Sequence, residues 1–302
     1  MDREERIRRP HVLVGYDGTP DSDAALRWAV DAARRRDVAL ELCHCWRWPY
    51  ASGHVDAAAE AVVKRAGENL LESGARRAEE LGAPLVRRRL LPGPVTEALL
   101  GASATAELVV LGAHERPEPG TAALEVPARS DRPVVVVRDA GEPPGPSSGA
   151  RPLNGGGRGL EDGPVVVGVD GTARCDPALG FAFAEAALRD GGLRVVYGCW
   201  EPAAVADAEL ALFTDRDLLE KTRAAELEEA VAPWRDRYPT VEVTVSLLLE
   251  RPCAALRDAV QGAALLVLGA RGTGTDPLGA TTTSMVRDAP CPVAIVPGHP
   301  AH

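Results

Sequence analysis

One structural unit occurs twice in this chain. The segment His11-Val-Leu-Val-Gly-Tyr-Asp-Gly-Thr19 returns as Val165-Val-Val-Gly-Val-Asp-Gly-Thr172, with an offset of 153 between Asp17 and Asp170. A second segment, Glu107-Leu-Val-Val-Leu-Gly-Ala113, returns as Ala264-Leu-Leu-Val-Leu-Gly-Ala270, with an offset of 157 between Gly112 and Gly269. Landmarks that recur in the same order at nearly constant offset indicate a duplication. We therefore expect two domains, residues 10–139 and 164–298, joined by a Gly-, Pro- and Ser-rich flexible linker at 140–163.

Short β-branched runs alternate with longer segments rich in Ala, Leu, Glu and Arg in each copy. Continuously apolar strands favour sheets covered on both faces, and alternating strands and helices favour a parallel sheet. The predicted fold is α/β, with two tandem doubly wound five-stranded parallel-sheet domains. The expected strands are 12–16, 39–45, 85–91, 108–111 and 133–137, then 165–169, 194–199, 241–248, 265–268 and 292–296. The expected helices are 21–35 (capped by Asp21), 56–81, 96–104, a short one after Gly120, an amphipathic one within 207–237 and one from near Ala280.

Composition and charge exclude several classes of protein. No apolar run approaches the ~20 residues of a membrane span, and the charged N-terminus is unlike a secretory signal. A formal net charge of −10 argues against binding to nucleic acid or anionic lipid. The six cysteines include no Cys-x-x-Cys pair, and Cys43 and Cys45 face one side of a strand while His44 faces the other, so they read as small buried residues without a metal. We expect a soluble, acidic, cytoplasmic protein.

The duplicated landmarks lie at the edge of the sheet where ligands bind in doubly wound folds. Asp17 and Asp170 close the first strand of each copy, and Gly112 and Gly269 close the fourth. Each aspartate is either a turn cap or a catalytic base, although no nucleophile–base pair accompanies it.

The second copy continues past Gly269 into a glycine-rich loop that contains Arg271 and leads to a helix beginning near Ala280. Backbone N–H groups at such a helix start, the hydroxyls of residues 281–283 and the cation together predict a phosphate site. The alternative is a glycine turn that only joins a strand to a helix. The sequence has neither a P-loop nor a G-x-G-x-x-G turn after the first strand.

The pattern V-x-V-G-x-D-G-T, then A-x-x-W-A in the first copy, then L-V-V-L-G-A, then A-P-C-P-V resembles the universal stress protein family. The resemblance covers both halves and indicates a tandem, two-domain protein of the actinobacterial type. It implies a Rossmann-like, adenine nucleotide α-hydrolase-like fold. Family members either bind ATP or do not, and the binders carry the loop G-x2-G-x9-G-[ST].

The second copy matches that loop in part. Gly269 and Gly272 keep the first spacing, but only six residues separate Gly272 from Gly279, and Ala280 replaces the Ser or Thr. By resemblance, Val169 and Asp170 would contact the adenine and ribose, and Cys199 would present its backbone to the adenine. The expected phosphate contacts are Leu268, Gly269, Arg271, Gly272, Gly279, Ala280, Thr281 and Thr282.

The first copy keeps only an outline of the site, in Asp17, Gly112, Gly120 and Thr121. Its loop holds two glutamates and two prolines within residues 115–119, and proline has no N–H to donate. One charge repulsion at contact costs on the order of a few kcal/mol at an effective dielectric near 20. A hydrogen bond to a charged group contributes about 1.5–3 kcal/mol, so we expect poor nucleotide binding in the first copy.

The expected function is therefore regulatory binding of ATP or a related adenine nucleotide, alone or with Mg²⁺, mainly in the second domain. The first alternative is a universal stress protein that binds no nucleotide and acts through dimerisation or a partner. The second is a slow ATPase, which would need a metal and a water-orienting group that the sequence does not reveal. In the family, the last strands pair domains, so residues 133–138 and 292–297 would join the two copies in a pseudo-dimer within one chain, and a homodimer is a further possibility.

Overall fold

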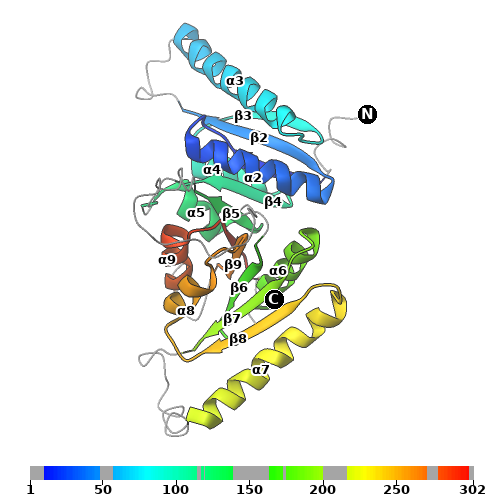
Figure 1. Cartoon of the computed structure of the whole chain (residues 1–302). Coiled ribbons are helices and arrows are strands. Elements are labelled where there is room, and N and C mark those ends of the chain that lie inside the picture. The colour runs from blue at the N-terminus through cyan, green and yellow to red at the C-terminus, as the bar shows by residue number, and fades with distance from the viewer. Residues whose placement is uncertain are drawn as a thin grey trace, which may run out of the picture. The chain divides into compact units, whose positions relative to one another are not determined.

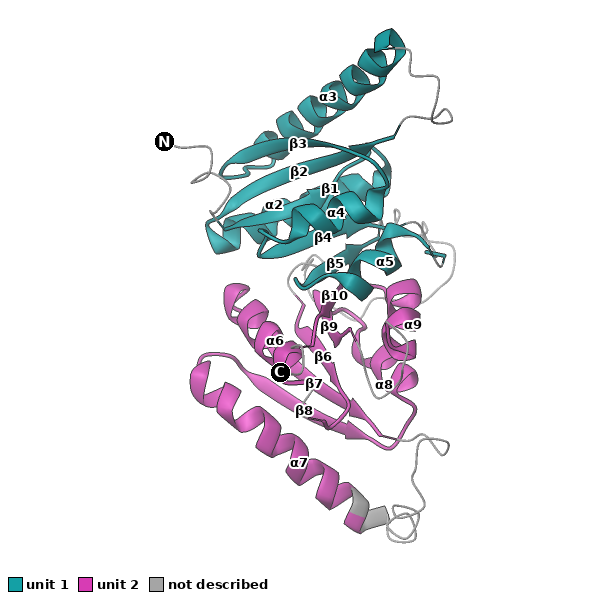
Figure 2. Ribbon diagram, turned by 180° about the vertical axis from the view of Figure 1, so that it is seen from behind, with its two compact units in different colours: residues 1–139 teal, residues 140–302 magenta. Residues whose placement is uncertain are grey.

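The computed structural model of the chain describes residues 10–47, 57–113, 117–118, 120–138, 163–172, 175–199, 216–270 and 278–298. The chain divides into two compact units, Met1–Asp139 and Ala140–His302 (Figure 2), and each is described by itself. Nearly all of the expected linker lies outside the described residues.

Unit 1 is a parallel sheet with helices on both faces (Figure 1). Its strands are β1 (His11–Gly15), β2 (Ala39–Trp46), β3 (Val86–Pro92), β4 (Leu108–Gly112) and β5 (Val134–Val137). Its helices are α2 (Pro20–Arg36), α3 (Ala57–Glu80), α4 (Val95–Ser103) and α5 (Ala122–Arg129). The strand order is β3-β2-β1-β4-β5 and every pairing is parallel. Helices α2 and α3 pack together on one face, and α4 and α5 pack together on the other.

Unit 2 repeats this arrangement. Its strands are β6 (Val165–Val169), β7 (Leu193–Gly198), β8 (Val243–Leu248), β9 (Leu265–Gly269) and β10 (Val293–Val296). Its helices are α6 (Asp176–Leu188), α7 (Arg216–Arg237), α8 (Pro252–Ala259) and α9 (Ala280–Asp288). The parallel strand order is β10-β9-β6-β7-β8. The predicted fold class is confirmed, and each described strand begins and ends within two residues of its expected bounds.

The duplication extends to the packing of the central strands. A Cβ atom on Gly15 would lie 3.0 Å from Cδ2 of Leu111, and a Cβ on Gly168 would lie 2.6 Å from Cδ2 of Leu268. Gly15 and Gly168 hold the same place in the duplicated motif, as do Leu111 and Leu268. The glycine before the motif's aspartate therefore makes room in both units for the leucine of the neighbouring strand.

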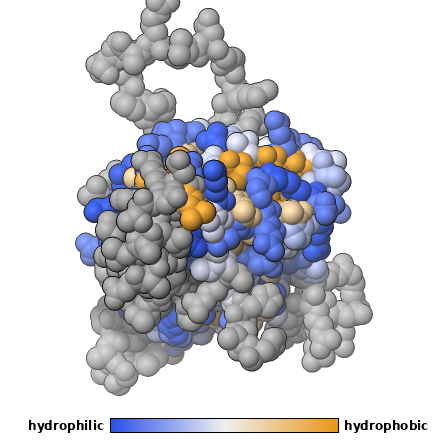
Figure 3. Space-filling model, turned by 90° about the horizontal axis from the view of Figure 1, so that it is seen from below, coloured by the Kyte–Doolittle hydropathy of each residue, from blue (hydrophilic) through white to orange (hydrophobic). Residues whose placement is uncertain are grey.

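Large hydrophobic side chains are mostly buried in both units. Among those exposed, Leu218 of α7 is 47% exposed. The face seen in Figure 3 is mostly hydrophilic, with its hydrophobic residues in small groups. Exposed apolar residues of this kind are ordinary on protein surfaces.

The predicted cap of α2 is wrong by two residues. Thr19, not Asp21, is the N-cap, and its hydroxyl oxygen accepts a hydrogen bond from the amide of Ser22 at 3.3 Å. Pro20 then fills the first helical position, where no N–H is needed. Asp21 lies in the first turn, where its negative charge suits the helix dipole.

The start of α2 lies directly against the end of β4. A Cβ atom on Gly112 would lie 2.6 Å from the backbone carbon and oxygen of Asp21 and 2.8 Å from the nitrogen of Ser22. These are backbone atoms of a helix, so they cannot move aside as a flexible side chain would. Gly112 therefore permits a close approach between a strand end and a helix start.

We predict that Gly112→Ala destabilises unit 1 by about 1–3 kcal/mol, the usual cost of overpacking. The matched control is Gly101→Ala in α4, where nothing lies within 4 Å of the new Cβ. Gly101→Ala should stabilise the helix by about 0.5–1 kcal/mol. Thermal unfolding of the full chain would measure both, and an unchanged melting temperature for Gly112→Ala would contradict the close-approach explanation.

Candidate functional site

The Asp-Gly-Thr motif forms the same hydrogen-bonded turn in both units. In unit 1, Oδ1 of Asp17 accepts hydrogen bonds from the amide of Thr19 at 3.0 Å and from its hydroxyl at 2.6 Å. In unit 2, Oδ1 of Asp170 accepts from the amide of Thr172 at 3.0 Å and from its hydroxyl at 2.7 Å. The intervening glycine has a positive φ in each copy, 79° and 73°. The turn-cap interpretation of both aspartates is thus confirmed.

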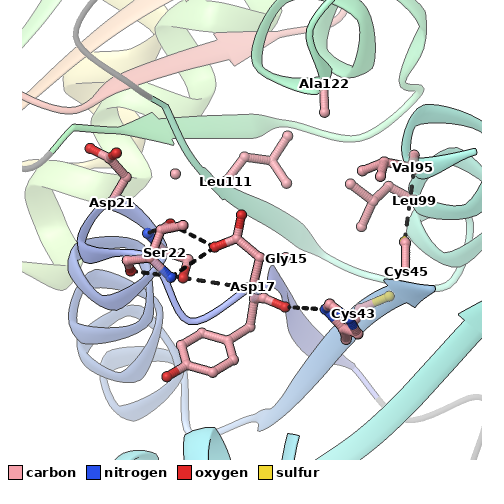
Figure 4. Close-up of a pocket in the computed structure, with 14 residues that line it drawn as sticks. Gly15, Asp17, Asp21, Ser22, Cys43, Cys45, Val95, Leu99, Leu111 and Ala122 are labelled. Atoms are coloured by element: carbon pink, nitrogen blue, oxygen red, sulfur yellow. Dashed lines mark hydrogen bonds between the residues drawn. The ribbon is translucent and has the colours of Figure 1, made fainter. Parts of the chain in front are cut away.

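A cavity of about 140 Å³ lies in unit 1 at the point where the strand order reverses between β1 and β4 (Figure 4). The ends of β1, β2 and β4, the starts of α2 and α5, and helix α4 all contribute to its walls. Asp17 and Gly112 both line it, so the structure brings together the two landmarks that the sequence placed at this edge. Asp21 and Ser22 also line it, and sequence reasoning missed them because only the close approach at Gly112 brings the α2 start here.

Gly120 and Thr121 lie at the start of α5, where they form the turn into the helix. Gly120 has φ 87°. Both the amide and the hydroxyl of Thr121 donate to the carbonyl of Glu118, at 3.2 and 2.8 Å. The Thr121 hydroxyl hydrogen is therefore used within the turn, and the cavity wall is formed by the next residue, Ala122.

In unit 2, two hydrogen bonds join the ends of the glycine-rich loop. The amide of Gly279 donates to the carbonyl of Ala270 at 2.9 Å, and the buried hydroxyl of Thr282 donates to the carbonyl of Gly269 at 2.9 Å. Residues 271–277, which include Arg271 and Gly272, lie outside the described part of the chain. The loop therefore leaves and returns at one point, beside the end of β9.

Helix α9 begins where the sequence predicted, at Ala280, with Gly279 as its N-cap. No side chain caps this helix start among the described residues, and its first turn contains no acidic residue. The N–H groups of Ala280, Thr281 and Thr282 are the ones that an α-helix leaves without intrahelical partners. The hydroxyl of Thr282 supports the loop, so its backbone is what this residue can offer to an anion.

The residues expected to contact the adenine and ribose differ in what they can offer to a ligand. The side chains of Val169 and Leu268 are buried, so these residues can reach a ligand only through their backbone. The amide of Cys199 donates to the carbonyl of Leu248 at 3.0 Å. The expectation that Cys199 offers its backbone to adenine is therefore corrected for its N–H, which is used in extending the β7–β8 pairing.

Tyr197 and Arg223 are neighbours of this site that sequence reasoning missed. A Cβ on Gly171 would lie 2.9 Å from the Tyr197 hydroxyl, so the ring packs on the duplicated turn. Burial raises the pKa of Tyr197, while the charge of Arg223 on α7 lowers it. The parallel pairing of Tyr197 with Val169 sets this ring beside the end of β6, and this register is given by the structure rather than by a sequence motif.

Cys43 and Cys45 lie on one side of β2, as predicted, and both line the unit 1 cavity. A hydrogen bond from Cys43 lowers the pKa of the Cys45 thiol, although burial opposes this shift. The same hydrogen bond, together with burial, raises the pKa of Cys43. His44 contacts a different partner, with Nδ1 2.9 Å from the carbonyl oxygen of Tyr16. From the sequence we predicted only that both cysteines are small buried residues.

The described residues contain no cluster of three or more His, Cys, Asp or Glu side chains suited to a metal ion. Over the same residues, no helix is both long enough and apolar enough to cross a membrane.

Sequence comparisons find the same relatives over both units. A profile of the universal stress protein family matches residues 9–138 and 163–297. Universal stress protein Rv1996 of Mycobacterium tuberculosis is 27% identical over 326 residues, and the match covers 96% of each chain. Universal stress protein Rv2028c of the same species is 31% identical over 240 residues, which cover 78% of this chain and 76% of the relative.

Solved structures show the same fold. A universal stress protein from Archaeoglobus fulgidus aligns with a TM-score of 0.66 at 18% identity, over 96% of this chain and 97% of the other. A protein from Pseudomonas aeruginosa described as a putative universal stress protein aligns with a TM-score of 0.57 at 15% identity, over 97% of this chain and 95% of its own.

We predict that Thr282→Val destabilises unit 2 by about 1–3 kcal/mol, because it leaves the carbonyl of Gly269 without its hydroxyl donor in a buried place. Thr283→Val is the matched control, since the Thr283 side chain is half-exposed and this change keeps the hydrogen bond from Thr282 to Gly269. Urea unfolding of the full chain would compare them. Equal stability of the two variants would contradict a supporting role for Thr282.

We predict that Cys45 is alkylated at lower pH than Cys199, although both side chains are half-buried. Only the thiolate reacts; the pKa of Cys45 is lowered by Cys43, whereas burial raises the pKa of Cys199. The pH profile of iodoacetamide labelling, read by mass spectrometry, would test the order. Cys43→Ala should move the Cys45 profile to higher pH, and an unmoved profile would contradict the proposed hydrogen bond.

Proposed function

Because the chain belongs to the universal stress protein family, we propose that it binds ATP or a related adenine nucleotide in unit 2 as a regulatory ligand. The phosphates would lie at the N-terminus of α9, and the adenosine would lie at the carboxyl end of β6. The protein would act in the cytoplasm in a stress response.

The observation that carries this proposal is the pair of hydrogen bonds that closes the loop after β9. They hold the first turn of α9 against the strand end, 2.9 Å separating each donor from its acceptor on Ala270 or Gly269. Helix starts of this kind attract phosphate through their N–H groups and their dipole. The loop between them would add Arg271 as a permanent cation and Gly272 as close-approaching backbone.

The turn after β6 supports the adenosine end. Asp170 uses one carboxylate oxygen, Oδ1, to hold the turn through Thr172. A carboxylate fixed in this way can accept hydrogen bonds from ribose hydroxyls through its other oxygen. The backbone of Val169 would lie along the base, and the carbonyl rather than the amide of Cys199 would face it.

The shortened loop favours one alternative, a protein that binds no nucleotide and acts through the association of its units or of two chains. Three residues fewer than the family's ATP loop leave less backbone around the outer phosphates. Nucleotide retained by the purified full chain would exclude this alternative. Release of phosphate above background would support the ATPase instead, and sedimentation would decide whether two chains associate.

We predict that Arg271→Ala weakens ATP binding by the full chain about 10- to 100-fold, the value of a hydrogen bond to a charged group. Arg257→Ala is the control, because Arg257 is an exposed arginine on α8 in the same unit. Calorimetric titration with ATP would measure both. No heat of binding to the unaltered chain would overturn the proposal, and equal affinities of the two variants would remove Arg271 from the phosphate site.

A further inference from the structure

The unit 1 cavity and the unit 2 loop occupy the same place in the duplicated fold, yet they differ in charge. In unit 1 both Asp17 and Asp21 line the cavity (Figure 4), and each brings a carboxylate to this edge of the sheet. In the duplicated sequence, Asp-Gly-Thr-Pro-Asp of unit 1 corresponds to Asp-Gly-Thr-Ala-Arg of unit 2, so Asp21 corresponds to Arg174. The aspartate of the motif is shared, and the residue four positions later reverses its charge.

Several hydrogen-bond donors at the start of α2 are already used within the protein. The amide of Asp17 donates to the hydroxyl of Ser22 at 3.4 Å, and that hydroxyl donates to the carbonyl of Thr19 at 3.0 Å. The amide and hydroxyl of Thr19 both donate to Asp17, and the amide of Ser22 donates to Thr19. Pro20 has no N–H at all. The donors of Thr19 and Ser22 are therefore already committed to bonds within this helix start.

The start of α5, on the opposite wall of the cavity, also carries negative charge. Its first turn contains Glu125, whereas the first turn of α9 in unit 2 has Thr283 at the corresponding position and no acidic residue. The hydroxyl of Thr121 donates to a backbone carbonyl. Neither α5 nor α9 has a side-chain cap among the described residues, so the start of α5 differs from that of α9 by this negative charge.

The remaining wall is apolar and the space is small. Leu99, Leu111, Val95 and Ala122 line the cavity opposite the aspartates (Figure 4). Its volume of about 140 Å³ is close to the ~150 Å³ of an apolar cavity that accepts a benzene ring. This half-open space thus suits one ring of a ligand, with acceptor oxygens at its polar edge.

We infer that unit 1 binds an uncharged, ring-bearing ligand that donates hydrogen bonds, with the chemistry of an unphosphorylated nucleoside, and that Asp21 excludes phosphate esters. The ring would lie against Leu99 and Leu111, and ligand hydroxyl or amino groups would donate to the aspartates. The two units of one chain would then take ligands of different charge. This inference extends the proposed function but is measured at a separate site.

Cys45 provides a readout specific to this cavity, because its thiol lines the wall. The experiment measures iodoacetamide labelling of Cys45 in the full chain by mass spectrometry, with adenosine or with ATP present. Adenosine should slow the labelling, and ATP should need at least about a tenfold higher concentration for the same protection, since like charges brought together oppose binding. Protection by ATP at the same concentration as adenosine, or by neither compound, would overturn the inference.

Two substitutions of Asp21 test whether its charge, rather than its size, sets the preference for adenosine over ATP. Asp21→Asn should narrow the preference for adenosine over ATP, and Asp21→Arg should narrow it further or reverse it. Asp31→Asn, on the same helix but paired with Arg35, should leave it unchanged. Unaltered selectivity in Asp21→Arg, in a protein with an unchanged melting temperature, would also overturn the role of Asp21. Failure of the unit 2 proposal is read separately, as absence of calorimetric ATP binding, and does not affect the labelling of Cys45.

Discussion

Both units depend on one interaction, the carboxylate of an aspartate that holds the threonine two residues later. Asp17 and Asp170 each bind an amide and a hydroxyl through a single oxygen. The chain must turn from a buried strand into a helix within a few residues, and this bond keeps the turn closed while glycine supplies the positive φ. The helix start, the neighbouring strand end and the ligand edge are all positioned from this turn.

The two units share a backbone arrangement but carry different side chains at the edge of the sheet. In unit 2 the start of α9 keeps hydroxyl-bearing residues and an uncapped set of amides, with Thr282 bracing the loop from behind. In unit 1 the equivalent helix, α5, also lacks a side-chain cap in the described part of the chain but has Glu125 in its first turn. Hydrogen bonds among Thr19, Ser22 and Asp17 use several donors at the start of α2. The backbone turn is therefore shared, while the side chains around it differ between the two units.

Most of the fold could be predicted because its signals are local. Short runs rich in apolar and β-branched residues placed the described strands to within two residues, and Gly279 followed by Ala280 placed the start of α9. The wrong or missing predictions concern features that depend on contacts formed only in the folded chain. The cap of α2 moved to Thr19 because proline suits the first helical position. The N–H of Cys199 is used by a neighbouring strand, and the position of Asp21 depends on how closely α2 approaches Gly112. Spacing along the chain does not report such contacts.

The closed base of the loop after β9 has an evolutionary consequence. Once Ala270 and Gly279 are joined, the entropy of closing the segment between them changes only slowly with its length, by about 0.6 kcal/mol for each doubling. Insertions and deletions there can accumulate while the sheet and α9 keep their stability. Tandem copies of this fold can thus differ in the length and sequence of this segment while the core around it stays the same.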